Sequence, residues 1–154
     1  MIDDANIPPH DITLENALLG GIIMNPDEFS KVEAHISDGS IFYQSITQSL
    51  WKLLKKMKMN NEEISAPTVS ACLSAQDKKI GLTAYYISGI IVDAPSKSSL
   101  EAYSKKLYEQ FLFREIIKST YTIQQSAYDN KINSYDEIVS AHSYLGELIS
   151  FKPS

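Results

Sequence analysis

The stretch from Ser98 to Tyr128 most constrains the fold, because no glycine or proline interrupts it. It predicts one helix of about 30 residues, near 45 Å long at about 1.5 Å per residue. Apolar residues cover more than one stripe of this helix, and Phe111–Phe113 alone spans most of its circumference. The middle of the helix should therefore be buried on two sides. Because a small bundle covers only one side, we expect a second chain or a partner on the other.

A second helix should follow after a short turn at residues 129–133. Ser134 and Glu137 have the spacing of a capping box, with serine at the N-cap and glutamate three residues on. Apolar residues then recur at helical spacing up to Ile149. A long helix, a short turn and a second helix predict an antiparallel helical hairpin over residues 98–150. Two such hairpins could pack face to face as a dimer, and residues 151–154 would start a linker.

Residues 10–97 predict a small helical bundle, preceded by a loose leader at residues 1–9. Each expected helix begins at a residue that suits an N-cap, or after an apolar pair. The segment TAYYISGIIV also suits a strand, but we favour a helix because its neighbours are helical and no partner strand is visible. The expected helices begin after Asp11, after Asn25 with Pro26 at the first position, at Ser45 (running to Met59), after Ser65 (through Leu73), and at Thr83. The fold class is therefore all-α.

Charge and composition exclude several classes of protein. The chain has 19 acidic and 14 basic side chains, a net charge of -5, whereas a protein that tracks a nucleic-acid backbone needs a basic surface. We therefore expect no direct nucleic-acid binding. Apolar runs reach only about five residues, against the roughly 20 that span a bilayer. The acidic start is no signal peptide, and the single cysteine, Cys72, suits a reducing compartment, so we expect a cytoplasmic protein without membrane contact.

The sequence contains no recognisable catalytic, metal-binding or cofactor-binding motif. The glycines form neither a phosphate-binding loop nor a dinucleotide fingerprint. His10, His35 and His142 lie far apart and suit surface or packing positions rather than a metal site. Cys72 lies among apolar residues and is expected to be a buried structural thiol. Arg114 either pairs with a nearby carboxylate or serves an interface, since an unpaired buried guanidinium would be costly.

Two adjacent glycines, Gly20 and Gly21, lie inside the first expected helix. Each should destabilise a helix interior by about 1 kcal/mol relative to alanine. Small residues at both positions indicate close approach of a neighbouring helix rather than a hinge or a phosphate site. Trp51 is expected to be a core residue on the apolar face of the third helix.

Four segments resemble, in the same order, the N-terminal domain of DnaB-type replicative helicases, over about residues 7–128. The resemblance is carried by the order and spacing of the segments rather than by one motif. Thr47-Gln48 replaces the family's usual His-Arg, and His142 its usual glutamate, which points to a divergent member of phage or plasmid origin. The four segments are PPHDITLENALLGGIIMNP, IFYQSITQSLWKLL, AYYISGIIVDAPS and EAYSKKLYEQFLFREII.

The resemblance implies a non-catalytic assembly and docking domain of a hexameric helicase. Paired hairpins would build the ring as a trimer of dimers, primase would dock on it, and a helicase loader would be a further partner. This chain would need no cofactor, because ATP and magnesium would bind a RecA-like domain in the full-length enzyme. The alternative is a free-standing phage or plasmid protein that mimics the domain to load or inhibit a host helicase.

The resemblance also assigns interface residues. The family's primase-docking surface falls on Tyr86, Arg114, Ile117 and Ile123. We further expect Leu107, Phe111, Tyr121 and Leu145 to contribute to the partner or oligomer interface.

Overall fold

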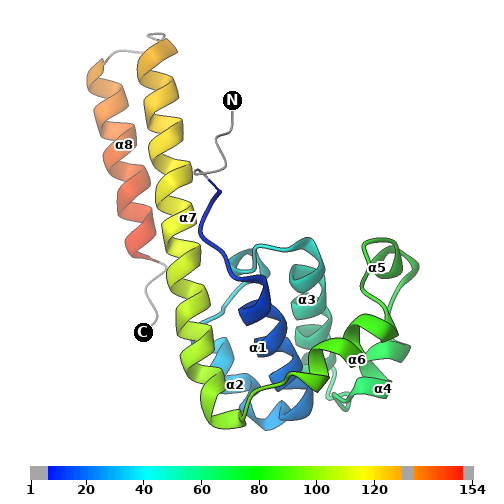
Figure 1. The fold of residues 1–154 in the computed structure, drawn as a ribbon. Coiled ribbons are helices and arrows are strands. Elements are labelled where there is room, and N and C mark those ends of the chain that lie inside the picture. The colour runs from blue at the N-terminus through cyan, green and yellow to red at the C-terminus, as the bar shows by residue number, and fades with distance from the viewer. Residues whose placement is uncertain (1–6, 130–133, 151–154) are drawn as a thin grey trace. The chain divides into compact units, whose positions relative to one another are not determined.

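The computed structural model describes residues 7–129 and 134–150, and every regular element in these two ranges is helical, as predicted. Figure 1 shows a group of short helices and a long helical hairpin. The α-helices are α1 (Ile12–Met24), α2 (Phe29–Glu33), α3 (Ser45–Met59), α4 (Ala66–Ala71), α5 (Ala75–Lys79), α6 (Ala84–Val92), α7 (Leu100–Asp129) and α8 (Ser134–Ile149). Short 3-10 helices cover Pro26–Glu28, Gly39–Ile41 and Lys97–Ser99.

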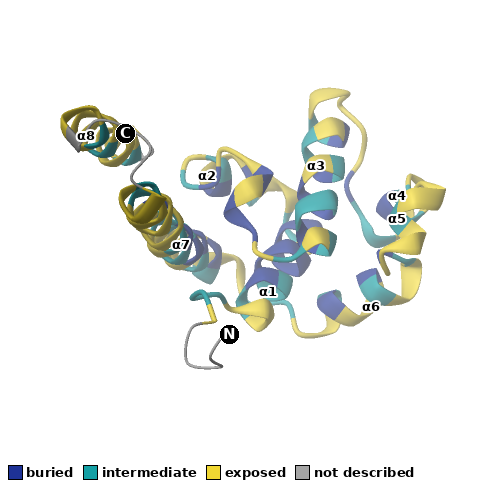
Figure 2. Cartoon of the chain, turned by 90° about the horizontal axis from the view of Figure 1, so that it is seen from above, coloured by how far each residue is buried: buried dark blue, intermediate teal, exposed yellow. Residues whose placement is uncertain are grey.

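Helix α1 is the central helix of the bundle. It begins where predicted, because the Asp11 carboxylate accepts a hydrogen bond from the backbone N–H of Leu14 at 2.9 Å. Its second half is apolar on every side, and each residue from Leu18 to Ile23 is buried. A helix that is hydrophobic all round requires neighbours all round. Figure 2 shows this concentration of buried residues on α1.

Helix α3 has the predicted bounds and buries the predicted face. Leu50, Trp51 and Leu54 have no exposed surface. The Trp51 ring stacks on Phe29 with ring centroids 5.1 Å apart, which joins α3 to α2. This aromatic pair makes Trp51 part of the core, as expected.

Two local predictions differ in detail from the structure. Asn25 is the N-cap of the following 3-10 turn with Pro26 at its start, as predicted, but its side chain makes no capping hydrogen bond there; its amide donates to the Gly21 carbonyl at 3.2 Å and closes α1. Helix α4 ends at Ala71 rather than Leu73, because Ser74 and Asp77 form a capping box that starts the unpredicted helix α5. A helix start can thus be missed when the helix is only one turn long.

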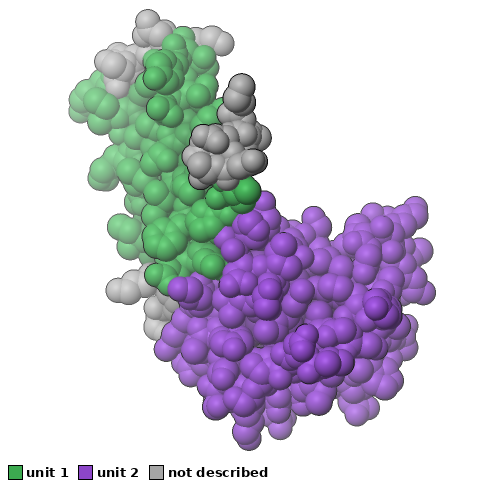
Figure 3. All heavy atoms as spheres, in the orientation of Figure 1, with its two compact units in different colours: residues 1–9, 109–154 green, residues 10–108 purple. Residues whose placement is uncertain are grey.

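Helix α7 belongs to both compact units of the chain. One unit comprises residues 10–108, and the other comprises residues 109–154 with residues 1–9 (Figure 3). The helix begins at Leu100, after a 3-10 turn, rather than at Ser98. Helix α8 runs back alongside it, so the predicted antiparallel hairpin is present (Figure 1).

Some predictions lie outside the described residues. These are most of the leader at residues 1–9, the centre of the turn between α7 and α8, the capping role of the Ser134 side chain, and the linker at residues 151–154. Within the described residues, no helix has both the length and the apolar content needed to cross a bilayer.

Candidate functional site

A groove lies between the two helices of the hairpin. Its volume is about 700 Å³. Three of the predicted interface residues on α7 line it, and Leu145 faces it from α8. The full lining is Ile117, Thr120, Tyr121, Ile123, Gln124, Ala141 and Leu145.

The hairpin around this groove exposes many large apolar side chains. Ile117 is 48% exposed, Tyr121 62% and Leu145 44%, and Figure 2 draws α8 mostly in the colour of exposed residues. Lys118 is the only charged residue between Ile116 and Tyr128. Further exposed apolar residues of the hairpin are Phe113, Ile116, Tyr128, Tyr135, Ile138, Val139, Tyr144 and Ile149. A surface this apolar is typical of a protein interface.

The predicted interface residues Leu107 and Phe111 lie elsewhere on α7. Their side chains are 1% and 5% exposed, so the chain itself already covers them. Phe113, two residues further on, is 49% exposed. One side of the helix is therefore buried within the chain and the other side is open, and a partner on the open side stays a prediction.

Arg114 makes a contact that neither sequence alternative included. Its Nη1 donates a hydrogen bond to the backbone carbonyl of Pro9 at 3.0 Å, and the residue is partly buried. The guanidinium thus holds the segment that precedes α1. This contact uses part of the donor capacity of Arg114 within the chain.

Tyr86 lies on α6, which begins where the Thr83 hydroxyl accepts a hydrogen bond from the Tyr86 backbone N–H at 3.2 Å. The Tyr86 hydroxyl donates to the side-chain oxygen of Asn16 on α1. Partial burial, together with the negative charge of Glu15, raises the pKa of the Tyr86 phenol to about 12. This hydroxyl is therefore engaged inside the bundle and stays protonated at neutral pH.

The glycine pair of α1 is a packing contact, as predicted. A Cβ on Gly20 would collide with the backbone of α6, within 2.8 Å of the Ile90 carbonyl carbon and closer still to its oxygen. A Cβ on Gly21 would collide with the side chain of Leu100 and lie 3.4 Å from Pro95. Both glycines let neighbouring segments approach α1 more closely than any other residue would allow.

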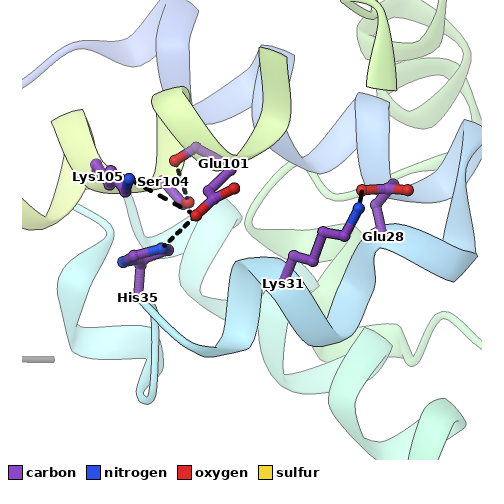
Figure 4. Close-up of polar contacts among 6 residues, drawn as sticks. All are labelled: Glu28, Lys31, His35, Glu101, Ser104 and Lys105. Atoms are coloured by element: carbon purple, nitrogen blue, oxygen red, sulfur yellow. Dashed lines mark hydrogen bonds and ion pairs between the residues drawn. The ribbon is translucent and has the colours of Figure 1, made fainter. Parts of the chain in front are cut away.

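A small polar cluster joins the end of α2 to the start of α7 (Figure 4). Glu101 Oε1 lies 3.3 Å from His35 Nε2 and 3.6 Å from the Lys105 ammonium. The hydrogen bond from His35 and the charge of Lys105 lower the pKa of the Glu101 carboxyl. We interpret this cluster as a surface contact.

The other histidines and the cysteine show no catalytic arrangement. His10 stacks on Tyr43 with ring centroids 4.0 Å apart, and His142 is exposed. The prediction that Cys72 is buried is wrong, because it ends the short helix α4 on an exposed side. Among the residues that the structure describes, no group of histidine, cysteine or acidic side chains is arranged to hold a metal ion.

Comparison with protein families decides what kind of domain carries these surfaces. The family model described as DnaB-like helicase N terminal domain matches residues 7–109. The chain belongs to this family.

Two solved structures share the fold of this DnaB-type domain. The crystal structure of the N-terminal domain of DnaB helicase from Mycobacterium tuberculosis matches with a TM-score of 0.81 at 22% identity, covering 92% of this chain and 99% of that chain. A structure of a DnaB-like replicative helicase and its interactions with primase matches with a TM-score of 0.72 at 15% identity, covering 90% of this chain and 31% of that chain.

Sequence relatives are named as replicative DNA helicases. Replicative DNA helicase DnaC of Bacillus subtilis (strain 168) is 26% identical over 149 residues, which is 95% of this chain and 32% of the relative. Replicative DNA helicase DnaB of Geobacillus stearothermophilus is 26% identical over 124 residues, which is 79% of this chain and 27% of the relative. The chain therefore spans less than a third of the length of these two relatives.

Glu15 is the residue of this DnaB-type domain whose role the sequence did not reveal. Its side chain has no exposed surface. The carboxylate accepts hydrogen bonds at 2.7 Å from the backbone N–H of Tyr43 and from the Thr47 hydroxyl, and at 3.3 Å from the backbone and side chain of Gln44. It thus caps the N-terminus of α3 from a different helix, where the helix dipole favours a negative charge. Glu15 was matched to the family motif, but only the fold places it beside Thr47.

Proposed function

We propose that this chain is a non-catalytic assembly and partner-docking domain of a hexameric replicative DNA helicase. The hairpin of one copy pairs with the hairpin of a second copy, and three such dimers form the ring. Family membership and the helicase relatives support this role. In the whole helicase, ATP and magnesium would bind a RecA-like domain, and the protein would act in the cytoplasm.

The observation that carries the proposal is the exposed apolar surface of the hairpin. Burying an apolar side chain completely contributes about 1.5–3 kcal/mol, so half-exposed side chains such as Phe113, Tyr121 and Leu145 have about 1 kcal/mol each left to contribute. Association costs an estimated 4–15 kcal/mol in lost freedom of motion. In a two-fold interface, both copies bury the same side chains. The apolar residues of two hairpins together are therefore enough to offset that cost.

Primase is the proposed heterologous partner, docking through Tyr86, Arg114, Ile117 and Ile123. The resemblance assigns these residues, and a similar structure is that of a helicase together with its interactions with primase. Ile117 and Ile123 both line the hairpin groove, so they have surface available for a partner. A helicase loader is a further proposed partner, for which the resemblance assigns no residues.

Sedimentation equilibrium from low to high micromolar concentration tests the assembly role. The wild-type chain is expected to dimerise, and the double substitution Tyr121→Ser with Leu145→Ser should weaken dimerisation at least tenfold. Gln125→Ser, at an exposed polar position of α7 that does not line the groove, serves as the matched control. A wild-type chain that stays monomeric at high micromolar concentration contradicts the proposal.

Calorimetric titration with the primase of the same replication system tests the docking role. Ile123→Ala and the charge reversal Arg114→Glu should each weaken binding at least tenfold, provided that circular dichroism shows an intact fold. Unchanged affinity for both variants removes these residues from the docking surface. No measurable association with primase would refute the docking role itself.

A further inference from the structure

The outward side of α6 carries an apolar face that nothing in the bundle covers. Tyr85 is 90% exposed and Val92 is 82% exposed. Gly89 lies between them, four residues after Tyr85 and three before Val92, so all three share one face of the helix. Two large apolar side chains so exposed on one short helix indicate a surface that a partner covers.

Packing within the chain does not explain Gly89. Glycine lowers the helix propensity of an interior position relative to alanine. At Gly20, the close packing against Ile90 offsets this loss of stability. A Cβ on Gly89 would instead meet no atom within 4 Å. The missing side chain therefore opens a site on the surface rather than a contact in the core.

Gly89 opens onto a groove between α1 and α6. The groove has a volume of about 520 Å³, and Tyr85, Gly89 and Asp93 line it from α6. Asn16 lines it from α1, and its side chain accepts the hydrogen bond from the Tyr86 hydroxyl. The Tyr86 hydroxyl and the Asn16 side-chain oxygen are thus already paired with each other, and an apolar side chain can enter without leaving that hydroxyl unsatisfied.

The charge along the groove is negative. Asp93 is the only charged residue among those that line it. The Glu15 carboxylate does not line the groove, but its charge acts on Tyr86, which does. One lining carboxylate and no lining cation make the groove complementary to a positively charged partner.

We infer that the groove between α1 and α6 docks a basic amphipathic helix of a partner protein. The helix crosses α6 at Gly89, where the absent side chain lets the two backbones approach closely. An apolar side chain of the partner enters the groove beside Tyr85, and a lysine or arginine reaches Asp93. This mode is the helix-in-groove recognition of peptides. Tyr86, which the proposed primase-docking surface includes, also lines the groove, so the inference rests on that part of the proposed function and specifies the docking element as a basic helix.

The test uses the full chain and two fluorescent peptides. The first is a helical peptide of leucine, alanine and lysine, about 18 residues long so that it folds alone, and the second has glutamate in place of every lysine. The basic peptide should bind and shift the amide resonances of residues 13–17 and 85–93, and the acidic peptide should not bind. No binding of the basic peptide, or shifts confined to the hairpin, would overturn the inference.

Variants separate the groove from other surfaces. Gly89→Leu fills open space, so the fold should persist while peptide affinity falls at least tenfold. Ala84→Leu places the same side chain on the same helix outside the groove and should change nothing. Asp93→Lys should abolish binding of the basic peptide. Unchanged affinity for Gly89→Leu or Asp93→Lys overturns the inference.

Two further results distinguish this inference from the proposed function. The double variant at Tyr121 and Leu145 should bind the basic peptide as tightly as wild type, whatever its oligomeric state. If the Gly89→Leu variant instead sediments as a smaller assembly than wild type, the groove is an interface between copies and the inference is wrong.

Discussion

Gly20→Ala should destabilise the bundle, although alanine is the better helix former. The new Cβ would lie 2.8 Å from the Ile90 carbonyl carbon and 3.4 Å from the Ile91 nitrogen, with the Ile90 oxygen closer still. These atoms are backbone, so no side-chain rotation relieves the collision and α1 or α6 must shift as a whole. Overpacking of this kind costs about 1–3 kcal/mol.

The magnitude follows from the difference between two effects. Because the collision is with backbone, its destabilisation should lie at the upper end of that range, about 3 kcal/mol. The higher helix propensity of alanine should stabilise the chain by about 1 kcal/mol. The net loss of unfolding free energy is thus about 2 kcal/mol. For a chain of this length, that corresponds to a decrease in melting temperature of about 4–8 °C.

Urea unfolding monitored by tryptophan fluorescence measures this loss. Trp51 is the single tryptophan, fully buried in the same compact unit as Gly20, so its emission reports unfolding of that unit. The midpoint should fall while the slope m stays constant, because the surface exposed on unfolding is unchanged. Far-UV circular dichroism provides a second probe of the transition.

Two other glycines supply matched controls for the same substitution. Gly89→Ala adds a methyl group to open space and should stabilise the chain by up to about 1 kcal/mol. Gly21→Ala meets the flexible end of the Leu100 side chain, so its effect should lie between the other two. If Gly20→Ala is as stable as wild type, or if the order of the three variants is reversed, the close approach of α1 and α6 is not what requires glycine.

Three further predictions concern polar groups. Glu15→Gln should cost about 2–3 kcal/mol of unfolding free energy, since it removes charge-assisted hydrogen bonds from a buried site; urea unfolding measures it, and a loss below about 0.5 kcal/mol would contradict the capping role. Tyr86→Phe should cost about 1 kcal/mol by deleting the hydrogen bond to Asn16. Because the folded pKa of Tyr86 is raised to about 12, wild type should keep this phenol's contribution below about pH 10 and lose it towards pH 12; equal alkaline stability of wild type and Tyr86→Phe would refute this. Glu101 has a lowered pKa, so its contribution to folding stability should be present above the ordinary carboxyl pKa and lost as the pH falls through the folded value. A carboxyl ¹³C titration should show a higher pKa for Glu101 in the His35→Ala variant. If the pKa does not rise, the contact with His35 is not the cause of the lowered value.

Local signals in the sequence were sufficient for most helices. Helix α3 was predicted with its correct bounds because a wide apolar face repeats at helical spacing from Ser45 to Met59. The cap at Asp11 was also correct, because an acidic side chain before an apolar run satisfies free N–H groups by itself. The close approach at Gly20 was predicted because a doubled glycine inside a helix requires a compensating contact.

Features that depend on distant residues were not predictable in the same way. Asn25 occupies the N-cap position that the sequence indicates, but its side-chain amide bonds to the preceding helix rather than to the following turn. Glu15 lies on α1 but caps the N-terminus of α3, and a local sequence pattern cannot show a contact between two helices. Cys72 is exposed at the C-cap of α4, and the next helix begins shortly after it at the capping box of Ser74 with Asp77.

The helical hairpin shows a second limit of sequence reasoning. An excess of apolar residues on α7 predicted a second covered side, and the structure leaves Phe113 and Tyr121 open. The sequence therefore indicates how much surface requires a partner. It does not indicate whether a second copy or another protein provides the cover, because both offer apolar contacts.

Helix α1 also limits how this family can change in length. Successive residues of a helix point about 100° apart, so Glu15 reaches α3 while its neighbour Asn16 reaches α6, and Gly20 faces α6 one turn later. Inserting or deleting a single residue between these positions would rotate one set of contacts away from its partner. Natural length variation in this domain should accordingly be excluded from α1 and accumulate in exposed connections such as residues 60–63.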